Sequence, residues 1–199
     1  MKIPSHRRPH GFTLIELLVV IAIIAVLASA GFAAGNAAIQ KARKTTALAT
    51  ATAIETAVNN FYTEYGSMPS DGSADIVLKT DAAPGIKMLE VLLGMEGTGT
   101  NVLNTRAIKF LSVREGKGKK NGLIYNTTGT AIEGLFDPWG GPFHVMLDLD
   151  YDEKLDIPSS VLNGGRTLNG RRVAVWSLGN DGVKGTGGKK SDDVVTWGQ

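Results

Sequence analysis

A membrane-length apolar stretch containing a single charge limits what this chain can fold into. From Phe12 to Gly35 there are 24 residues, and Glu16 is the only charged one. About 20 consecutive apolar residues span the hydrocarbon core of a bilayer as a helix. An acid in such a helix is energetically costly and usually marks a function. The sequence therefore predicts a transmembrane helix in which Glu16 has a specific role.

A secretory signal peptide is the alternative interpretation of this segment. Such a peptide has a shorter apolar core that ends at a small-residue cleavage site, for which Ala28-Ser29-Ala30 is a candidate. Two features oppose this interpretation. The apolar stretch begins abruptly after Gly11, and a signal peptide gains nothing from Glu16. An ordinary membrane anchor leaves Glu16 equally unexplained.

The composition excludes several classes of protein. Beyond the basic leader, residues 1–11, the chain carries 18 lysines and arginines against 19 acids, so it lacks the sustained basic excess of a nucleic-acid-binding protein. It contains no cysteine, which excludes disulfides, thiol catalysis and zinc–thiolate sites. His144 is the one histidine beyond the leader. No Ser, His and Asp set or acid pair stands out, so we do not expect an enzyme.

The order Gly11-Phe12-Thr13-Leu14-Ile15-Glu16, after a basic leader and before an apolar helix, resembles the processing site of the type IV pilin and pseudopilin superfamily. The resemblance implies that a prepilin peptidase/methyltransferase cuts after Gly11 and methylates the new amino terminus on Phe12. It also implies that Glu16 of one subunit pairs with the Phe12 amine of a neighbour in a helical fibre. Opposite charges attract strongly in a low dielectric, and pairing them offsets the penalty that each bears alone.

The helix is expected to continue well beyond the membrane. No proline lies between Pro9 and Pro69. One face with helical spacing carries apolar and aromatic residues as far as Gly66, namely Ile54, Val58, Phe61, Tyr62 and Tyr65. A helix from about Phe12 to Tyr65 would be roughly 80 Å long, so its second half must pack on a globular domain.

The rest of the chain indicates an α+β fold, in which this long helix packs on a small antiparallel β-sheet with a loop-rich C-terminus. Phe143, Val145, Leu147 and Leu149 alternate as in a half-buried strand. The predicted organisation is a cleaved leader (1–11), a transmembrane half-helix (12–35), an amphipathic half-helix (36–66), a variable loop-rich insertion (67–136), and a sheet with a carboxylate loop (137–199).

A further series of motifs is similar to the major pseudopilin of the type II secretion system. They occur in the same order, as Tyr62–Pro69 (YTEYGSMP), Asp137–Gly140 (DPWG), Ser177–Gly182 (SLGNDG) and Ser191–Asp193 followed by Trp197. The resemblance covers most of the chain except residues 74–130.

This resemblance implies one calcium ion in the C-terminal loop. Its side-chain ligands would be Asp181, Asp192 and Asp193, and Leu178 and Val183 would supply backbone carbonyls. Calcium takes six to eight oxygen ligands in flexible loops. The alternative is that the three acids are solvated and balance the nearby lysines.

A second acidic segment, LDLDYDEKLD, places Asp148, Asp150, Asp152 and Asp156 at relative positions 1, 3, 5 and 9, as in part of an EF-hand loop. It has Glu153 where that loop has glycine, and Ser159 where the loop has its final glutamate. A second calcium site and a strand that ends in a polar turn both remain possible interpretations.

These observations lead to the expectation of a structural subunit of a periplasmic pseudopilus. It would be a single-pass inner-membrane protein with its C-terminal domain in the periplasm. Its partners would be copies of itself, minor pseudopilins, the inner-membrane assembly platform and the processing enzyme, without nucleic acid. The alternatives are a type IV pilin or minor pilin for adhesion, motility or DNA uptake, and a membrane-anchored binding module.

Overall fold

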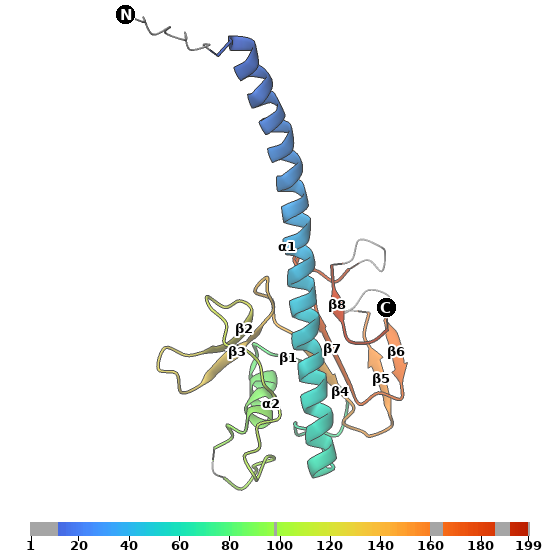
Figure 1. The fold of residues 1–199 in the computed structure, drawn as a ribbon. Helices are drawn as coiled ribbons and strands as arrows, with labels where there is room; N and C mark the ends of the chain where they lie inside the picture. The colour runs from blue at the N-terminus through green and yellow to red at the C-terminus, as the bar shows by residue number, and fades with distance from the viewer. Residues whose placement is uncertain (1–11, 98, 160–164, 186–191, 199) are drawn as a thin grey trace, which may run out of the picture. The chain divides into compact units, whose positions relative to one another are not determined.

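The computed structural model describes residues 12–97, 99–159, 165–185 and 192–198. The chain forms two compact units, residues 1–41 and 42–199, and helix α1 contributes to both. The leader, with Gly11 and the predicted cleavage point, lies outside the described residues. The elements, in chain order, are α1 (Leu14–Tyr65), β1 (Ile76–Lys79), α2 (Ala83–Leu93), β2 (Gly122–Tyr125), β3 (Ile132–Phe136), β4 (His144–Leu147), β5 (Lys154–Ile157), β6 (Arg166–Asn169), β7 (Val173–Ser177) and β8 (Val194–Val195) (Figure 1).

Helix α1 is continuous over 52 residues, as the sequence predicted. It ends where Gly66 adopts φ +68° and donates its N–H to the carbonyl of Tyr62 at 2.8 Å, a left-handed terminus that favours glycine. In the second unit, one stripe of the helix is buried, at Ala47, Ala51, Ile54, Val58 and Phe61. The predicted amphipathic face is therefore confirmed.

The main sheet has four antiparallel strands in the order β1-β4-β7-β8. Strand β4 is central, with Val145 opposite Leu78 of β1 and Val175 of β7. The antiparallel α+β fold is thus confirmed. The strand predicted around Phe143–Leu149 also forms, but all four residues of β4 are buried rather than every second one.

Both faces of β4 are buried because different parts of the chain cover them. Val145 and Leu147 enter a core shared with α1 and α2, whereas Met146 enters a second core. Strands β5 and β6 pair with each other and contribute Leu155, Ile157 and Leu168 to this second core. The strand alternation of period two is preserved, but each side has its own apolar cover.

The segment 67–136 is built into the fold. It supplies β1 to the main sheet, and it supplies α2, whose Met88, Leu89 and Leu92 are fully buried in the helix-side core. Buried Asn104 fixes the loop that follows α2. Its side-chain amide donates to the carbonyls of Val91 and Ile108, and its Oδ1 accepts from the Tyr65 hydroxyl at 2.8 Å. Helix α1 and this segment therefore share one packed interior.

Candidate functional site

The N-terminal turn of α1 is organised around Thr13 and Glu16. The Glu16 carboxylate accepts the backbone N–H and the hydroxyl of Thr13, both at 2.8 Å. The Thr13 hydroxyl accepts the backbone N–H of Glu16 at 3.3 Å. This reciprocal pattern is a capping box, which satisfies N–H groups at a helix start. Its signal, Thr-x-x-Glu, is present in the sequence, but the local role of Glu16 was not predicted.

The first half of α1 is apolar on every side and none of its described side chains is buried. Phe12 is 77% exposed, Ile15 70% and Ile24 59%. The helix is long and apolar enough to cross a membrane, judged by length and composition. A helix that is apolar all round requires a lipid or protein environment, and Phe12 and Glu16 lie at its N-terminal end.

Carboxylate side chains hold the C-terminal loop in place by accepting hydrogen bonds from its backbone N–H groups. The Oδ2 atom of Asp192 accepts the N–H groups of Asn180 and Asp181, at 2.5 and 3.2 Å. Gly179 has φ +67°, and a Cβ atom there would lie 2.6 Å from the Asp192 carbonyl oxygen. Glycine is required at this close approach, which holds the 177–182 turn against Asp192.

The other two predicted calcium ligands also accept loop N–H groups. Asp181 Oδ1 accepts from Val183 at 2.9 Å, and Asp193 Oδ2 accepts from Gly185 at 2.7 Å. Among the described residues, these three carboxylates do not form a group whose ligand oxygens lie within 4.8 Å of one another. The donor set suits calcium, because carboxylates and carbonyls of a glycine-rich loop are the oxygens it prefers. Calcium in this loop stays a prediction.

Asp137, the first residue of the DPWG motif, bonds both to the turn that follows β3 and to Ser177 at the end of β7, where the C-terminal loop begins. It is 1% exposed. Its Oδ1 accepts the N–H groups of Trp139, Gly140 and Gly141 at 2.8–2.9 Å, and its Oδ2 accepts the Ser177 hydroxyl at 2.5 Å. The Ser177 oxygen in turn accepts the N–H of Gly179 at 3.1 Å. A buried carboxylate with four donors is a strong structural link between the turn after β3 and the end of β7.

The second acidic segment forms the turn from β4 to β5, as expected for a strand that ends in a polar turn. Asp148 is buried, and its two oxygens accept the N–H groups of Asp152 and Glu153 at 3.2 and 3.1 Å. The carboxylates that meet are those of Asp148, Asp150 and Asp75, with ligand oxygens within 4.8 Å of one another.

Two of the four predicted ligands thus come together, and Asp75, which precedes β1, joins them. Asp152 and Asp156 bond elsewhere, to the N–H of Lys154 and to the hydroxyl of Thr167. The sequence did not reveal Asp75 because it lies 73 residues before Asp148, and only the β1–β4 pairing brings the two together. A second calcium site stays a prediction.

Comparisons with known proteins identify the N-terminal motif and the family of the chain. Residues 6–32 match the family described as the prokaryotic N-terminal methylation motif. The chain is 32% identical over 127 residues to the fimbrial protein EcpC of Eikenella corrodens, a match that covers 63% of this chain and 78% of EcpC. The chain belongs to the type IV pilin superfamily. It is also 31% identical over 110 residues to the type IV major pilin protein PilE of Neisseria gonorrhoeae, covering 55% of this chain and 63% of PilE. No solved structure gives a significant match.

The family motif contains the three residues predicted to carry processing and assembly in this pilin, Gly11, Phe12 and Glu16. The apolar half of α1 follows them directly. The motif and the helix together support N-terminal methylation and membrane anchoring. Neither relative is named as an enzyme, which fits a structural role.

A buried histidine, His144, lines a hollow together with residues of the C-terminal loop. His144 is 4% exposed, its ring stacks on Trp176 with centroids 5.4 Å apart, and its Nδ1 has no hydrogen-bond partner in the described residues. Burial, together with the positive charge of Lys79, lowers the pKa of His144 from 6.5 to about 4, against the opposing effect of Asp81. The ring is therefore neutral and apolar in character at neutral pH.

The stability of the domain should fall as the pH is lowered from 6.5 to about 4. Within this interval His144 is protonated in the unfolded chain but stays neutral in the folded chain, so lowering the pH favours unfolding. Burial raises the pKa values of Asp75 and Asp148, and these two groups act in the opposite direction. We therefore expect His144→Phe, which keeps the stacked ring, to lose less stability over this interval than the unmodified protein. Urea unfolding at pH values on either side of the interval measures this, and equal losses would contradict the role of His144.

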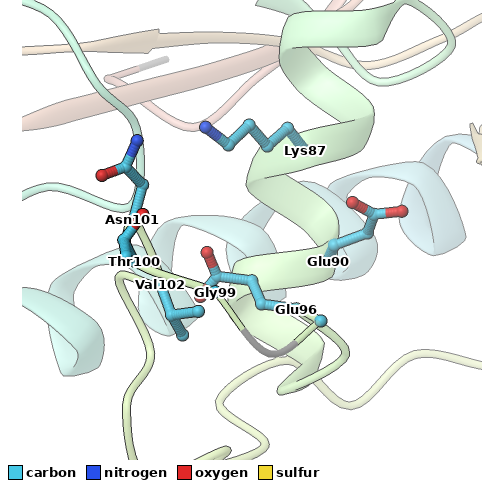
Figure 2. A pocket seen from close by; sticks show the side chains of 8 residues that line it. Lys87, Glu90, Glu96, Gly99, Thr100, Asn101 and Val102 are labelled. Atoms are coloured by element: carbon cyan, nitrogen blue, oxygen red, sulfur yellow. The ribbon is translucent and has the colours of Figure 1, made fainter.

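A shallow hollow next to α2 is one place where a ligand could bind if residues 74–130 form a binding module. Its volume is about 320 Å³, and Figure 2 shows Lys87 reaching from α2 toward Asn101 on the facing loop. Two of the three charged residues that line it already have partners. Lys87 pairs with Asp71 at 2.8 Å, and Glu96 accepts the N–H groups of Leu103 and Asn104. Because Lys87 and Glu96 are engaged within the fold, this hollow gives little support to a binding module.

Proposed function

We propose that this pilin is a structural subunit of the periplasmic pseudopilus of a type II protein secretion system. The observation that carries the proposal is the C-terminal loop, which has no cysteine and is fastened by Asp137, Asp181, Asp192 and Asp193. Many pilins of surface fibres close this loop with a disulfide, whereas the resembling pseudopilins use carboxylates and calcium.

In the proposed pathway the chain enters the inner membrane with its basic leader in the cytoplasm and its C-terminal domain in the periplasm. The prepilin peptidase cuts after Gly11 and the Phe12 amine is methylated. The assembly platform then adds the subunit to the base of the fibre, with minor pseudopilins as companions. Because α1 exposes apolar side chains on all sides, the helices of neighbouring subunits bury one another as they leave the lipid.

Calcium should stabilise the domain, and Asp181→Ala should remove most of that effect. A cation between the carboxylates of Asp181, Asp192 and Asp193 would relieve their mutual repulsion and order the loop, and a ligand that binds only the folded state raises its stability. The measurement is the thermal unfolding of the full chain in detergent, with calcium and with chelator. Asp71→Ala is the matched control, because it removes an exposed acid that belongs to neither predicted calcium site. An equal calcium effect in both variants would argue against the C-terminal site.

A surface pilus is the second candidate function, and the names of EcpC and PilE favour it. Deleting the gene and restoring it separates the two functions. Loss of exported proteins with unchanged surface fibres supports the pseudopilus, whereas loss of surface fibres with unchanged export supports the pilus. A membrane-anchored binding module predicts that neither changes and that function survives the loss of Glu16.

A further inference from the structure

A short, tightly turned segment that runs into β2 carries a concentrated positive charge. We call residues 114–123 the basic hairpin. At its base Glu115 and Leu123 form a parallel β-bridge, in which the Gly116 N–H donates to the carbonyl of Leu123 at 2.8 Å and the Leu123 N–H donates to that of Arg114 at 2.9 Å. At its tip Gly118 and Lys119 have positive φ values of +61° and +56°, and the Lys117 N–H donates to the carbonyl of Lys120 at 3.1 Å. The hairpin is thus a defined structure rather than the open loop that its composition suggests.

The cations of the basic hairpin are exposed and mostly unneutralised. Arg114, Lys117, Lys119 and Lys120 are all exposed, and Glu115 is the only acid among residues 114–123. In the described part of the chain, their one ion pair is between Lys119 and Glu133, at 3.9 Å. Lysine at a left-handed position such as 119 is uncommon, and strained backbone often accompanies a functional surface.

The β4–β5 turn, residues 148–154, carries the opposite charge. Asp150, Asp152 and Glu153 are exposed there, next to Asp75. This turn therefore concentrates negative charge that a cation from outside the chain can relieve, although Lys154 and Arg172 pair with two of its acids.

The two charged segments lie on different sides of the domain. The basic hairpin runs into β2, and the acidic turn runs into β5. Figure 1 shows β2 and its partner β3 on one side of the C-terminal half of α1, and β5 and β6 on the other. No ion pair joins the two segments in the described residues. Complementary patches on different faces of one subunit produce a head-to-tail contact, which repeats along a helical assembly rather than closing into a dimer.

We propose that the basic hairpin of one subunit docks on the β4–β5 acidic turn of a second copy of this chain. The inference rests on the proposed function, because it assumes a fibre, and it names the surfaces by which the periplasmic domains recognise each other. Charge complementarity of this kind sets register and partner choice more than raw affinity. The apolar helices supply the main driving force, and the charged contact selects among the offsets they allow.

Charge reversal tests the contact in the full chain, expressed with its companion proteins. Lys117→Glu with Lys120→Glu should lower the fibre yield about tenfold, which corresponds to about 1.4 kcal/mol. Asp150→Lys with Asp152→Lys should do the same, and combining the two pairs should restore most of the yield. Lys109→Glu with Arg166→Glu changes the net charge equally at exposed sites elsewhere and should leave assembly intact.

Cysteine cross-linking provides a direct readout because the chain has no native cysteine. Lys120→Cys with Asp150→Cys should yield a ladder of covalent oligomers under mild oxidation, whereas Lys109→Cys with Asp150→Cys should stay monomeric. Fibres that form normally without a ladder, and that tolerate both charge reversals, would overturn the docking proposal. Failure of the unmodified chain to form fibres at all would overturn the proposed function instead, so the two failures are distinguishable.

Discussion

Glu16→Ala should abolish fibre assembly while leaving the folded domain of residues 42–199 intact. In the proposed pathway, cleavage after Gly11 creates a positive amine on Phe12, and we expect this amine to pair in the fibre with the carboxylate of a neighbouring Glu16. Without the carboxylate the amine is buried unpaired, at a cost of about 3–5 kcal/mol per subunit. Assembly is measured as sedimentable or cross-linked oligomers, and the thermal unfolding of the domain serves as the control for folding.

The capping box provides two variants that separate the roles of Glu16. Glu16→Gln keeps a residue that can complete the box but removes the charge. Thr13→Ala keeps the charge but removes the hydroxyl that bonds Glu16, at a cost of about 1 kcal/mol to the helix start. If the charge carries assembly, Glu16→Gln fails like Glu16→Ala, and Thr13→Ala still assembles.

The opposite pattern of assembly in these two variants would assign Glu16 a purely local role. If Thr13→Ala fails and Glu16→Gln assembles, helix capping rather than pairing with the Phe12 amine is the function of this residue. In the single chain the carboxylate already accepts two hydrogen bonds from Thr13. A neighbour's amine must therefore share or displace them, and these bonds fix where the carboxylate lies before the neighbour arrives.

Local patterns predicted helix α1 and the presence of strand β4. Proline absence, helical spacing at Ile54, Val58 and Phe61, and Gly66 as the terminus specify α1 from sequence alone. The alternation around Val145 likewise specifies a strand. The alternation did not reveal that both faces of β4 are buried. The residues that cover the second face come from β5 and β6, and the sequence of β4 does not indicate this non-local contact.

The candidate sites likewise contain features that the local sequence specifies and features that depend on distant parts of the chain. The Thr13–Glu16 box is local and readable from the sequence, whereas the approach of Asp75 to Asp148 depends on the register in which Ile76 lies opposite Leu147. In the C-terminal loop, the sequence indicated the acids but not their partners. The backbone donors to Asp192 are set by the turn at Gly179, a conformation that the residue types allow without specifying.

Asp137→Ala should lower the stability of the domain by about 4 kcal/mol. The side chain accepts four hydrogen bonds, and removing it leaves the N–H groups of Trp139, Gly140 and Gly141 and the Ser177 hydroxyl without their acceptor. Each buried donor left unsatisfied costs about 1–3 kcal/mol, and partial access of water to the turn keeps the total near the lower end. Chemical unfolding of the full chain in detergent measures the loss.

The variants Asp137→Asn and Ser177→Ala separate the contributions that the two carboxylate oxygens of Asp137 make to the stability of the domain. Asparagine retains an acceptor for the three backbone N–H groups but presents an amide N–H₂ to Ser177, whose oxygen already accepts from Gly179. We therefore expect Asp137→Asn and Ser177→Ala to lose similar amounts, each less than Asp137→Ala. Because Ser177 precedes the C-terminal loop, both should also weaken any calcium response of that loop. If Asp137→Asn were as damaging as Asp137→Ala while Ser177→Ala were harmless, the charge of Asp137 would matter more than the hydrogen bond that joins it to β7.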